Sequence, residues 1–163
     1  MKININYSVL LIVFYLLTSC ASMKPPMTKY FEGQSISDYT YFYITPTNEL
    51  SSSTGVYGNQ LFLFGGDTKS INPADVISGI LLKNGFVRVN EIKDDNASKT
   101  MVINYGESGR RNVNLGYSIE VTIQFINAQT QNPIVVCTAE GQGDTEADDI
   151  RKAINRALEP LFK

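Results

Sequence analysis

The sequence of 163 residues contains no histidine, and this absence removes several classes of catalytic site at once. Histidine is the commonest general base near neutral pH, the partner of the nucleophile in serine and cysteine triads, and a frequent ligand of zinc. Sites of these kinds are therefore not expected. Catalysis by carboxylates alone remains open, so the acidic residues are the candidates for acid–base chemistry.

Those acidic residues lie where loops and helix starts normally carry charge. Two are in a polar loop and four are where the closing helix is expected to begin: Asp94, Asp95, Asp144, Glu146, Asp148 and Asp149. Acids in a first helical turn complement the helix dipole, and neither cluster has the spacing of a calcium loop. We expect solvated acids rather than an acid–base pair, with none of them deeply buried in a cleft, and we predict neither a metal site nor a cofactor.

Only two cysteines are present, and the position of the first is informative. Lys2 precedes an uninterrupted apolar run, Val9 to Leu17, which is too short to cross roughly 30 Å of hydrocarbon but is typical of a signal peptide. The next residues, Leu17-Thr18-Ser19-Cys20, resemble the bacterial lipobox. We therefore expect residues 1–19 to be cleaved and Cys20 to carry the lipid that anchors the chain to a membrane. The alternatives are an ordinary signal peptide with a chance cysteine, or an uncleaved anchor helix.

The residues after the lipobox indicate how the mature chain is organised. Residues 20–29 contain two prolines and no helix or strand period, so we expect an extended, lipid-anchored tether. Residues 30–163 have the length of one domain. Loss of Lys2 with the signal peptide changes the formal net charge from −2 to −3. This mild acidity gives no reason to expect nucleic-acid binding, which needs clustered lysine and arginine.

The same residues bear on where the mature chain is placed. Ala21 and Ser22 lack the aspartate associated with inner-membrane retention in some bacteria. Residues 23–26 lack the acidic signal that some lipoproteins use for surface export. The sequence therefore favours anchoring at the outer membrane, on its periplasmic side.

With Cys20 occupied by lipid, Cys137 has no partner for an internal disulfide, and the fold must depend on its core. Cys137 ends an apolar run that begins at Ile134. No basic residue or helix end that would activate a thiol is evident there. We expect a buried side chain that acts as a small hydrophobe.

Hydrophobic periodicity predicts two helices and about five strands. The first helix is expected to begin with Asn72 as its N-cap and to end before Gly85, and the closing helix to begin at Thr145. Strands are expected at 39–45, 86–90, 100–105, 117–127 and 133–140, a serine-rich loop at 47–54, and an ambiguous segment at 56–64. These elements predict an α+β two-layer sandwich, in which two helices cover a mostly antiparallel sheet of about five strands.

Two short motifs are candidates for ligand or partner contact. Gly141-Gln142-Gly143 lies between a strand and a helix, as in a dinucleotide-binding turn, but Glu146 replaces the third glycine and no βαβ unit can follow, so that interpretation is rejected. Arg110 and Arg111, within residues 109–116, are expected in an exposed, solvated loop, and the alternative is contact with an anion or a protein partner.

The order of elements also resembles a known group of proteins. A helix ending Leu81-Leu82-Lys83-Asn84-Gly85-Phe86, the strand Met101-Val102-Ile103-Asn104-Tyr105, a strand hairpin, and a helix ending Ala157-Leu158-Glu159-Pro160-Leu161-Phe162 resemble small bacterial envelope lipoproteins of uncharacterised function. Those proteins are in turn similar to the periplasmic domains of the curli-secretion lipoprotein and of the TolB N-terminal region. The resemblance supplies no catalytic residue, and it implies an accessory or interaction domain rather than an enzyme.

The first hypothesis is therefore a periplasm-facing lipoprotein that is not an enzyme and that binds an envelope protein. The alternative is a lipoprotein that binds a small envelope ligand such as a glycan or a lipid, and a hydrolase is a third possibility. A large apolar cleft would favour the ligand-binding alternative. A filled core with an exposed sheet face or edge would favour the first hypothesis.

Overall fold

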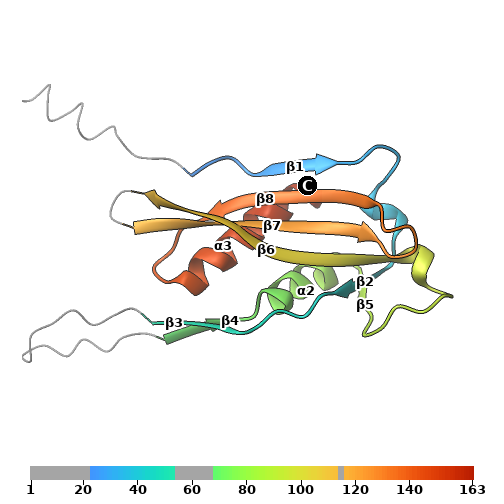
Figure 1. Cartoon of the computed structure of the whole chain (residues 1–163), viewed down its shortest axis with the longest axis horizontal. Helices are drawn as coiled ribbons and strands as arrows, with labels where there is room; N and C mark the ends of the chain where they lie inside the picture. Colours follow the sequence, from blue (N-terminus) through green and yellow to red (C-terminus); the bar gives the residue numbers. More distant parts are fainter. Residues whose placement is uncertain (1–22, 54–67, 114–115) are drawn as a thin grey trace, which may run out of the picture.

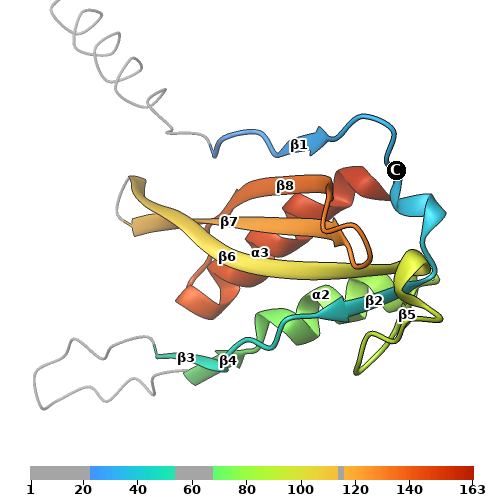
Figure 2. The ribbon, with the colours of Figure 1, turned by 45° about the vertical axis from the view of Figure 1, so that its right-hand side comes forward.

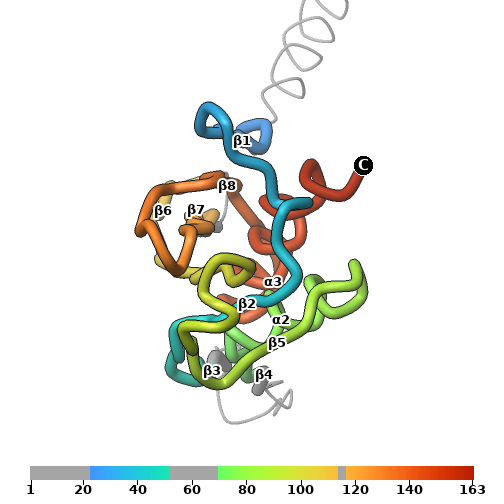
Figure 3. The backbone as a smooth tube through the Cα atoms, turned by 90° about the vertical axis from the view of Figure 1, so that its right-hand side faces the viewer, coloured from blue at the N-terminus to red at the C-terminus, as the bar shows by residue number. Residues whose placement is uncertain are grey.

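The computed structural model describes residues 23–53, 68–113 and 116–163, which form a mixed sheet covered on one face by two helices (Figure 1). Viewed along the strands, the central strands lie on one side and both helices on the other (Figure 3). The sheet contains, in spatial order, β1 (Met27–Tyr30), β8 (Pro133–Gly141), β7 (Gly116–Asn127), β6 (Thr100–Val113), β2 (Tyr41–Ile44) and β5 (Val87–Arg88).

Smaller elements complete the chain. The helices are α2 (Pro73–Lys83) and α3 (Glu146–Leu158), and a separate two-stranded sheet pairs β3 (Leu50–Ser53) with β4 (Thr68–Ile71). Three short 3-10 turns are η1 (Ile36–Asp38), η2 (Ala97–Lys99) and η3 (Glu159–Leu161). The predicted combination of two helices with a sheet is therefore confirmed at the level of an α+β fold.

Four details of the strands differ from the sequence prediction. The main sheet has six strands rather than about five, and β2 pairs in parallel with both β5 and β6, so the sheet is mixed. Residues 47–54, expected to be a loop, include strand β3. Residues 27–29, expected in the tether, belong to the edge strand β1. In each case the strand pairs with one that is distant in sequence. Local residue preferences do not predict such pairing.

The ends of α2 follow from its sequence, as predicted. The Asn72 side chain accepts a hydrogen bond from the Ala74 main-chain nitrogen at 3.0 Å, and Pro73 occupies the first helical position. After the helix, Gly85 adopts φ +89°. This left-handed residue lets the main-chain nitrogens of Gly85 and Phe86 donate to carbonyls in the last turn of α2, which closes the helix.

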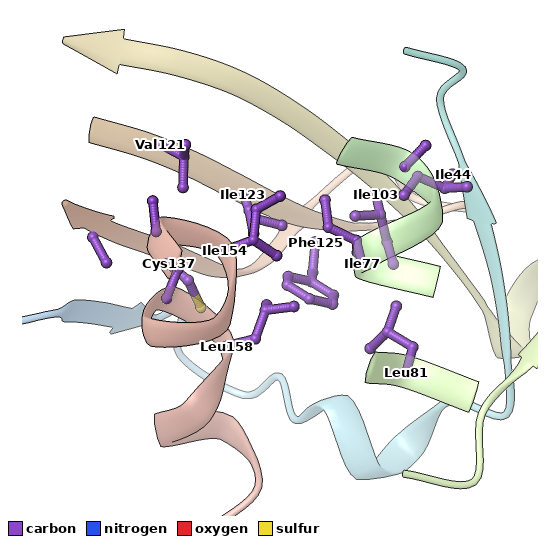
Figure 4. Packing of buried hydrophobic residues seen from close by; sticks show 14 of the residues in the cluster. Ile44, Ile77, Leu81, Ile103, Val121, Ile123, Phe125, Cys137, Ile154 and Leu158 are labelled. Carbon is purple, nitrogen blue, oxygen red and sulfur yellow. The ribbon is translucent and has the colours of Figure 1, made fainter. Parts of the chain in front are cut away.

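The core lies between the sheet and the helices. On β7 the inward residues Ile119, Val121, Ile123 and Phe125 are fully buried, as the predicted alternation requires. They meet side chains from both helices and the neighbouring strands, among them Ile77, Leu81, Ile103, Cys137, Ile154 and Leu158 (Figure 4). The ambiguous segment 56–64 lies outside the described residues.

Helix α3 approaches β8 unusually closely. A Cβ atom at Gly141 would lie 2.0 Å from the Asp149 carbonyl oxygen and 2.4 Å from the Ala153 nitrogen, both in the backbone of α3. Only glycine permits this approach. Gly141, the last residue of β8, therefore serves helix–strand packing.

Candidate functional site

Glu140, near the end of β8, is a buried carboxylate on the sheet face that points away from the helices. Its side chain is 2% exposed. Its partner across the ladder is Glu120 of β7, whereas the adjacent pair, Ala139 and Val121, points into the core. Because like charges directly opposite each other on neighbouring strands repel, two facing glutamates require cations nearby.

Arg111 and Lys24 supply those cations. The Arg111 guanidinium donates from Nε to Glu140 Oε1 at 3.1 Å and from Nη2 to Oε2 at 2.7 Å, a two-pronged contact. The Lys24 main-chain nitrogen donates to Glu140 Oε2 at 3.0 Å, and its Nζ lies 3.3 Å from Oε1 and 3.2 Å from Glu120 Oε2. Burial alone would raise the pKa of Glu140. The hydrogen bonds from Arg111, the larger contribution, and from Lys24 outweigh this effect and lower the pKa to about 2.

Arg156 connects this cluster to the closing helix. Its Nη1 donates to the main-chain carbonyl of Glu140, and its Nη2 donates to the carbonyl of Lys24 at 2.9 Å. Nη1 also lies 3.3 Å from the Met23 sulfur. The N-terminal segment, the sheet and α3 are therefore joined at one place, which we call the Glu140 cluster: Lys24, Arg111, Glu120, Glu140 and Arg156.

Two hollows flank the Glu140 cluster. A groove of about 690 Å³ runs between residues 24–28 and β8, with Glu120, Thr138 and Glu140 in its wall. A smaller hollow of about 230 Å³ is lined by Ser118 together with members of the cluster. The Ser118 hydroxyl is buried and has no hydrogen-bond partner among the residues that the structure describes. A water molecule or the polar group of a ligand would satisfy it.

The pair Arg110 and Arg111 does not lie in a loop, so that expectation is wrong. Both residues belong to β6, whose ladder with β7 continues to Val113 through a bulge between Glu107 and Gly109. They point to opposite faces of the sheet. Arg110 pairs with Glu146 of α3 and with Glu107 and lies over the Tyr117 ring, whereas Arg111 binds Glu140. Their contact with a partner or an anion stays a prediction.

The acids near the start of α3 include one exception to the prediction. Asp94, Asp95 and Asp144 are exposed, and Glu146 and Asp148 are half-buried, but Asp149 is buried. The prediction that none would be deeply buried is wrong for Asp149, because the turn after β8 folds back and its Gly143 main-chain nitrogen donates to the Asp149 carboxylate. Burial raises the pKa of Asp149 against the opposing effect of this hydrogen bond.

The arrangement around Asp149 favours a structural role over acid–base chemistry. A hollow of about 250 Å³ includes Tyr117, Asp144, Glu146 and Asp149 in its lining. However, Glu146 is bound to Arg110, and Asp149 accepts a backbone hydrogen bond. Paired catalytic carboxylates instead need environments that separate their pKa values while leaving both groups accessible to a substrate.

The structure describes only one of the two cysteines, Cys137. Cys20 lies outside the described residues, and its lipidation stays a prediction. Cys137 is a buried free thiol in the core, as predicted, and burial raises its pKa to about 11. It therefore carries no thiolate at neutral pH.

Across residues 23–53, 68–113 and 116–163, no helix is long and apolar enough to span a bilayer, and no three side chains gather as metal ligands.

Sequence reasoning missed the Glu140 cluster. Lys24 and Glu140 are 116 positions apart, and Arg111 and Glu140 are 29 apart. No local pattern brings such residues together. The available signal was Glu140 itself, a single acid at the end of the apolar strand that begins at Ile134, because a carboxylate at such a position needs a paired cation.

Removing the charge of Glu140 should lower the free energy of unfolding at neutral pH and leave it unchanged in acid. Because the folded pKa is lowered from 4.5 to about 2, the stabilisation is fully present above about pH 4.5 and disappears as the pH falls through about 2. Glu140→Gln should therefore lower the free energy of unfolding by about 3 kcal/mol at pH 7. Urea unfolding from neutral pH down to about pH 2 should show the gap closing.

Glu91→Gln is the matched control for this experiment. Glu91 is highly exposed and pairs only with Lys93 among the residues described. Its replacement should change the free energy of unfolding by less than about 0.5 kcal/mol at every pH. A gap for Glu140→Gln that persists unchanged in acid would show that the loss arises from packing rather than from the charge.

Neither a protein-family model nor a curated protein sequence matches this chain. Two solved structures of a PelC dodecamer from Paraburkholderia phytofirmans are similar in fold. One, a point variant in space group C2, has 12% identity and a TM-score of 0.48 and covers 84% of this chain and 95% of that chain. The other, in space group P6, has 13% identity and a TM-score of 0.47 and covers 84% and 96%.

Proposed function

We propose that this chain is a lipid-anchored lipoprotein of the bacterial outer membrane, facing the periplasm, whose single domain acts through contact with an envelope protein and not as an enzyme. The observation that carries the proposal is the fixed N-terminal segment. The residues that follow the lipobox cysteine become edge strand β1 and are bound at the Glu140 cluster. An anchor attached at Cys20 would thus be only a few residues away from the fixed segment.

The charged residues support the part of the proposal that excludes catalysis. The Glu140 carboxylate is neutralised by Arg111 and Lys24. The buried Asp149 carboxylate accepts the Gly143 main-chain hydrogen, and Glu146 is bound to Arg110. These groups are engaged in holding the fold, and each would have to give up a stabilising partner to take part in proton transfer.

Ligand binding is the second candidate function, and the groove beside β8 favours it. Its volume of about 690 Å³ falls within the range of small-molecule sites, and the Ser118 hydroxyl, which has no hydrogen-bond partner in the described part of the chain, lies in the adjoining hollow. A glycan or lipid that co-purifies with the lipoprotein, in addition to its anchor, would favour this function. Capture of one specific envelope protein by crosslinking in native membranes would favour the first.

Cys20→Ala should abolish membrane anchoring. Without the thiol there is no site for the lipid, and firm attachment needs two acyl chains or one chain with a second membrane-binding signal. The variant should accumulate as an unprocessed precursor or appear as a soluble chain. Its mass and its partition between membrane and soluble fractions test this expectation. Cys137→Ala is the control, since that thiol is buried and should have no part in anchoring. A Cys20→Ala chain that is cleaved normally yet stays firmly on membranes would contradict the assignment.

A further inference from the structure

Residues 23–30 give one edge of the molecule a composition suited to a membrane surface. Met23, Met27 and Tyr30 are exposed, and Met27 is 62% exposed. Lys24 and Lys29 alternate with them, and the stretch contains no acid. Apolar side chains with an interfacial tyrosine and flanking lysines are the residues that favour the boundary between headgroups and acyl chains.

This edge is a fixed part of the fold. Four residues of β1 pair in register with β8, from Met27 opposite Thr138 to Tyr30 opposite Val135. Upstream of the strand, Lys24 is held through its main-chain nitrogen by Glu140 and through its carbonyl by Arg156. The main chain of this edge is therefore held in place relative to the rest of the domain.

The lipid attachment point is close to the same edge. Cys20 precedes Met23, the first described residue, by three positions. Three extended residues span at most about 10 Å, and the headgroup layer of each leaflet is roughly 5–8 Å thick. An anchor at Cys20 would thus leave Met23 within reach of the headgroups.

We infer that the edge formed by residues 23–30 rests on the headgroup layer of the membrane that holds the anchor, with Met23, Met27 and Tyr30 in the interface and Lys29 toward anionic phosphates. This inference rests on the proposed lipid anchor at Cys20. The occupant of the edge is a lipid surface because the anchor brings that surface within reach, because Met23, Met27 and Tyr30 are exposed, and because the exposed Lys29 supplies a cation in a stretch that contains no acid.

The opposite side of the molecule supplies an internal comparison. Strand β5 forms the other edge of the main sheet, and Figure 2 shows β1 and β5 far apart, with the β3–β4 pair also distant from β1. Val87 of β5 is 47% exposed. Met27 and Val87 are therefore two exposed apolar residues on edge strands at the two ends of one sheet.

The experiment measures whether these two positions contact lipid. The mature lipoprotein is reconstituted in vesicles of phosphatidylethanolamine and phosphatidylglycerol, with Met27→Cys or Val87→Cys carrying a nitroxide label. The lipid blocks Cys20 and burial protects Cys137, so the introduced thiol is the one labelled. Collision with oxygen, which concentrates in lipid, is compared with collision with a water-soluble nickel chelate.

The inference expects the label at position 27 to collide several-fold less with nickel and more with oxygen than the label at position 87. Equal accessibility at both positions, on protein that floats with the vesicles, overturns the inference and leaves the anchor intact. Loss of both kinds of collision at position 27 means that a protein surface covers the edge, which also overturns it. Protein that fails to float with the vesicles at all overturns the proposed anchor itself.

Discussion

Gly141→Ala should prevent the domain from reaching its native packing. The added methyl group would lie 2.0 Å from the Asp149 carbonyl oxygen and 2.4 Å from the Ala153 nitrogen. Both atoms belong to the backbone of α3, so no side-chain rotation can relieve the overlap. The helix would have to move away from β8, and the buried residues of its apolar face would lose their contacts together. We expect the free energy of unfolding to fall by more than about 4 kcal/mol, an effect that few single substitutions reach.

A domain has about 5–15 kcal/mol of stability in total, so the Gly141→Ala variant should be largely unfolded or should show a greatly lowered denaturation midpoint. Circular dichroism and urea unfolding measure both outcomes. Gly79→Ala is the matched control. Gly79 lies within α2, and a methyl group added there would meet nothing within 4 Å beyond its chain neighbours and the backbone of its own helix, so its replacement should stabilise the helix by up to about 1 kcal/mol. A Gly141→Ala protein as stable as the parent would contradict the close approach of α3 to β8.

Leu158→Ala should have the second largest effect. Leu158 is the last residue of α3, is fully buried, and packs in the core beneath the sheet (Figure 4). Removing three carbons from a filled core costs their transfer free energy and leaves a cavity, for a total of about 2–5 kcal/mol. The free energy of unfolding from urea titration gives the value directly.

Leu82→Ala provides the comparison for that truncation. Leu82 lies in α2 but is 51% exposed, so the same change should alter stability by less than about 0.5 kcal/mol. A Leu158→Ala effect as small as that of Leu82→Ala would mean that the apolar face of α3 is not anchored in this core. Both variants keep a good helix former at the site, so helix propensity does not separate them.

The sequence predicts well those elements whose signals are local. Asn72, Pro73 and Gly85 mark the ends of α2, and the Thr145 side chain accepts a hydrogen bond from the Asp148 nitrogen at 3.2 Å at the start of α3, as expected of a cap. The alternation along β7 also identifies its buried face correctly. Each of these features involves residues within a few positions of one another, where backbone geometry leaves few choices.

The features that were missed depend on distant partners. The tether residues pair with β8, the serine-rich residues 50–53 pair with β4, and the glycine-rich stretch around Arg110 continues β6. In isolation each of these segments has the composition of a loop, and pairing overrides that preference. The Glu140 cluster was missed for the same reason, and so was Asp149, whose polar neighbours in sequence concealed its burial.

The pairing of β1 with β8 also determines when the domain can be completed. A chain exported with its N-terminus leading would deliver residues 27–30 to the far side of the membrane more than a hundred residues before the strand that receives them. Closing so long a loop is entropically costly, and non-local pairing of this kind slows folding. If Cys20 is the lipid attachment site, as proposed, the leading segment would thus remain accessible for acylation and cleavage while the rest of the chain emerges. Until that pairing forms, the edge of β8 exposes main-chain groups that another strand could bind.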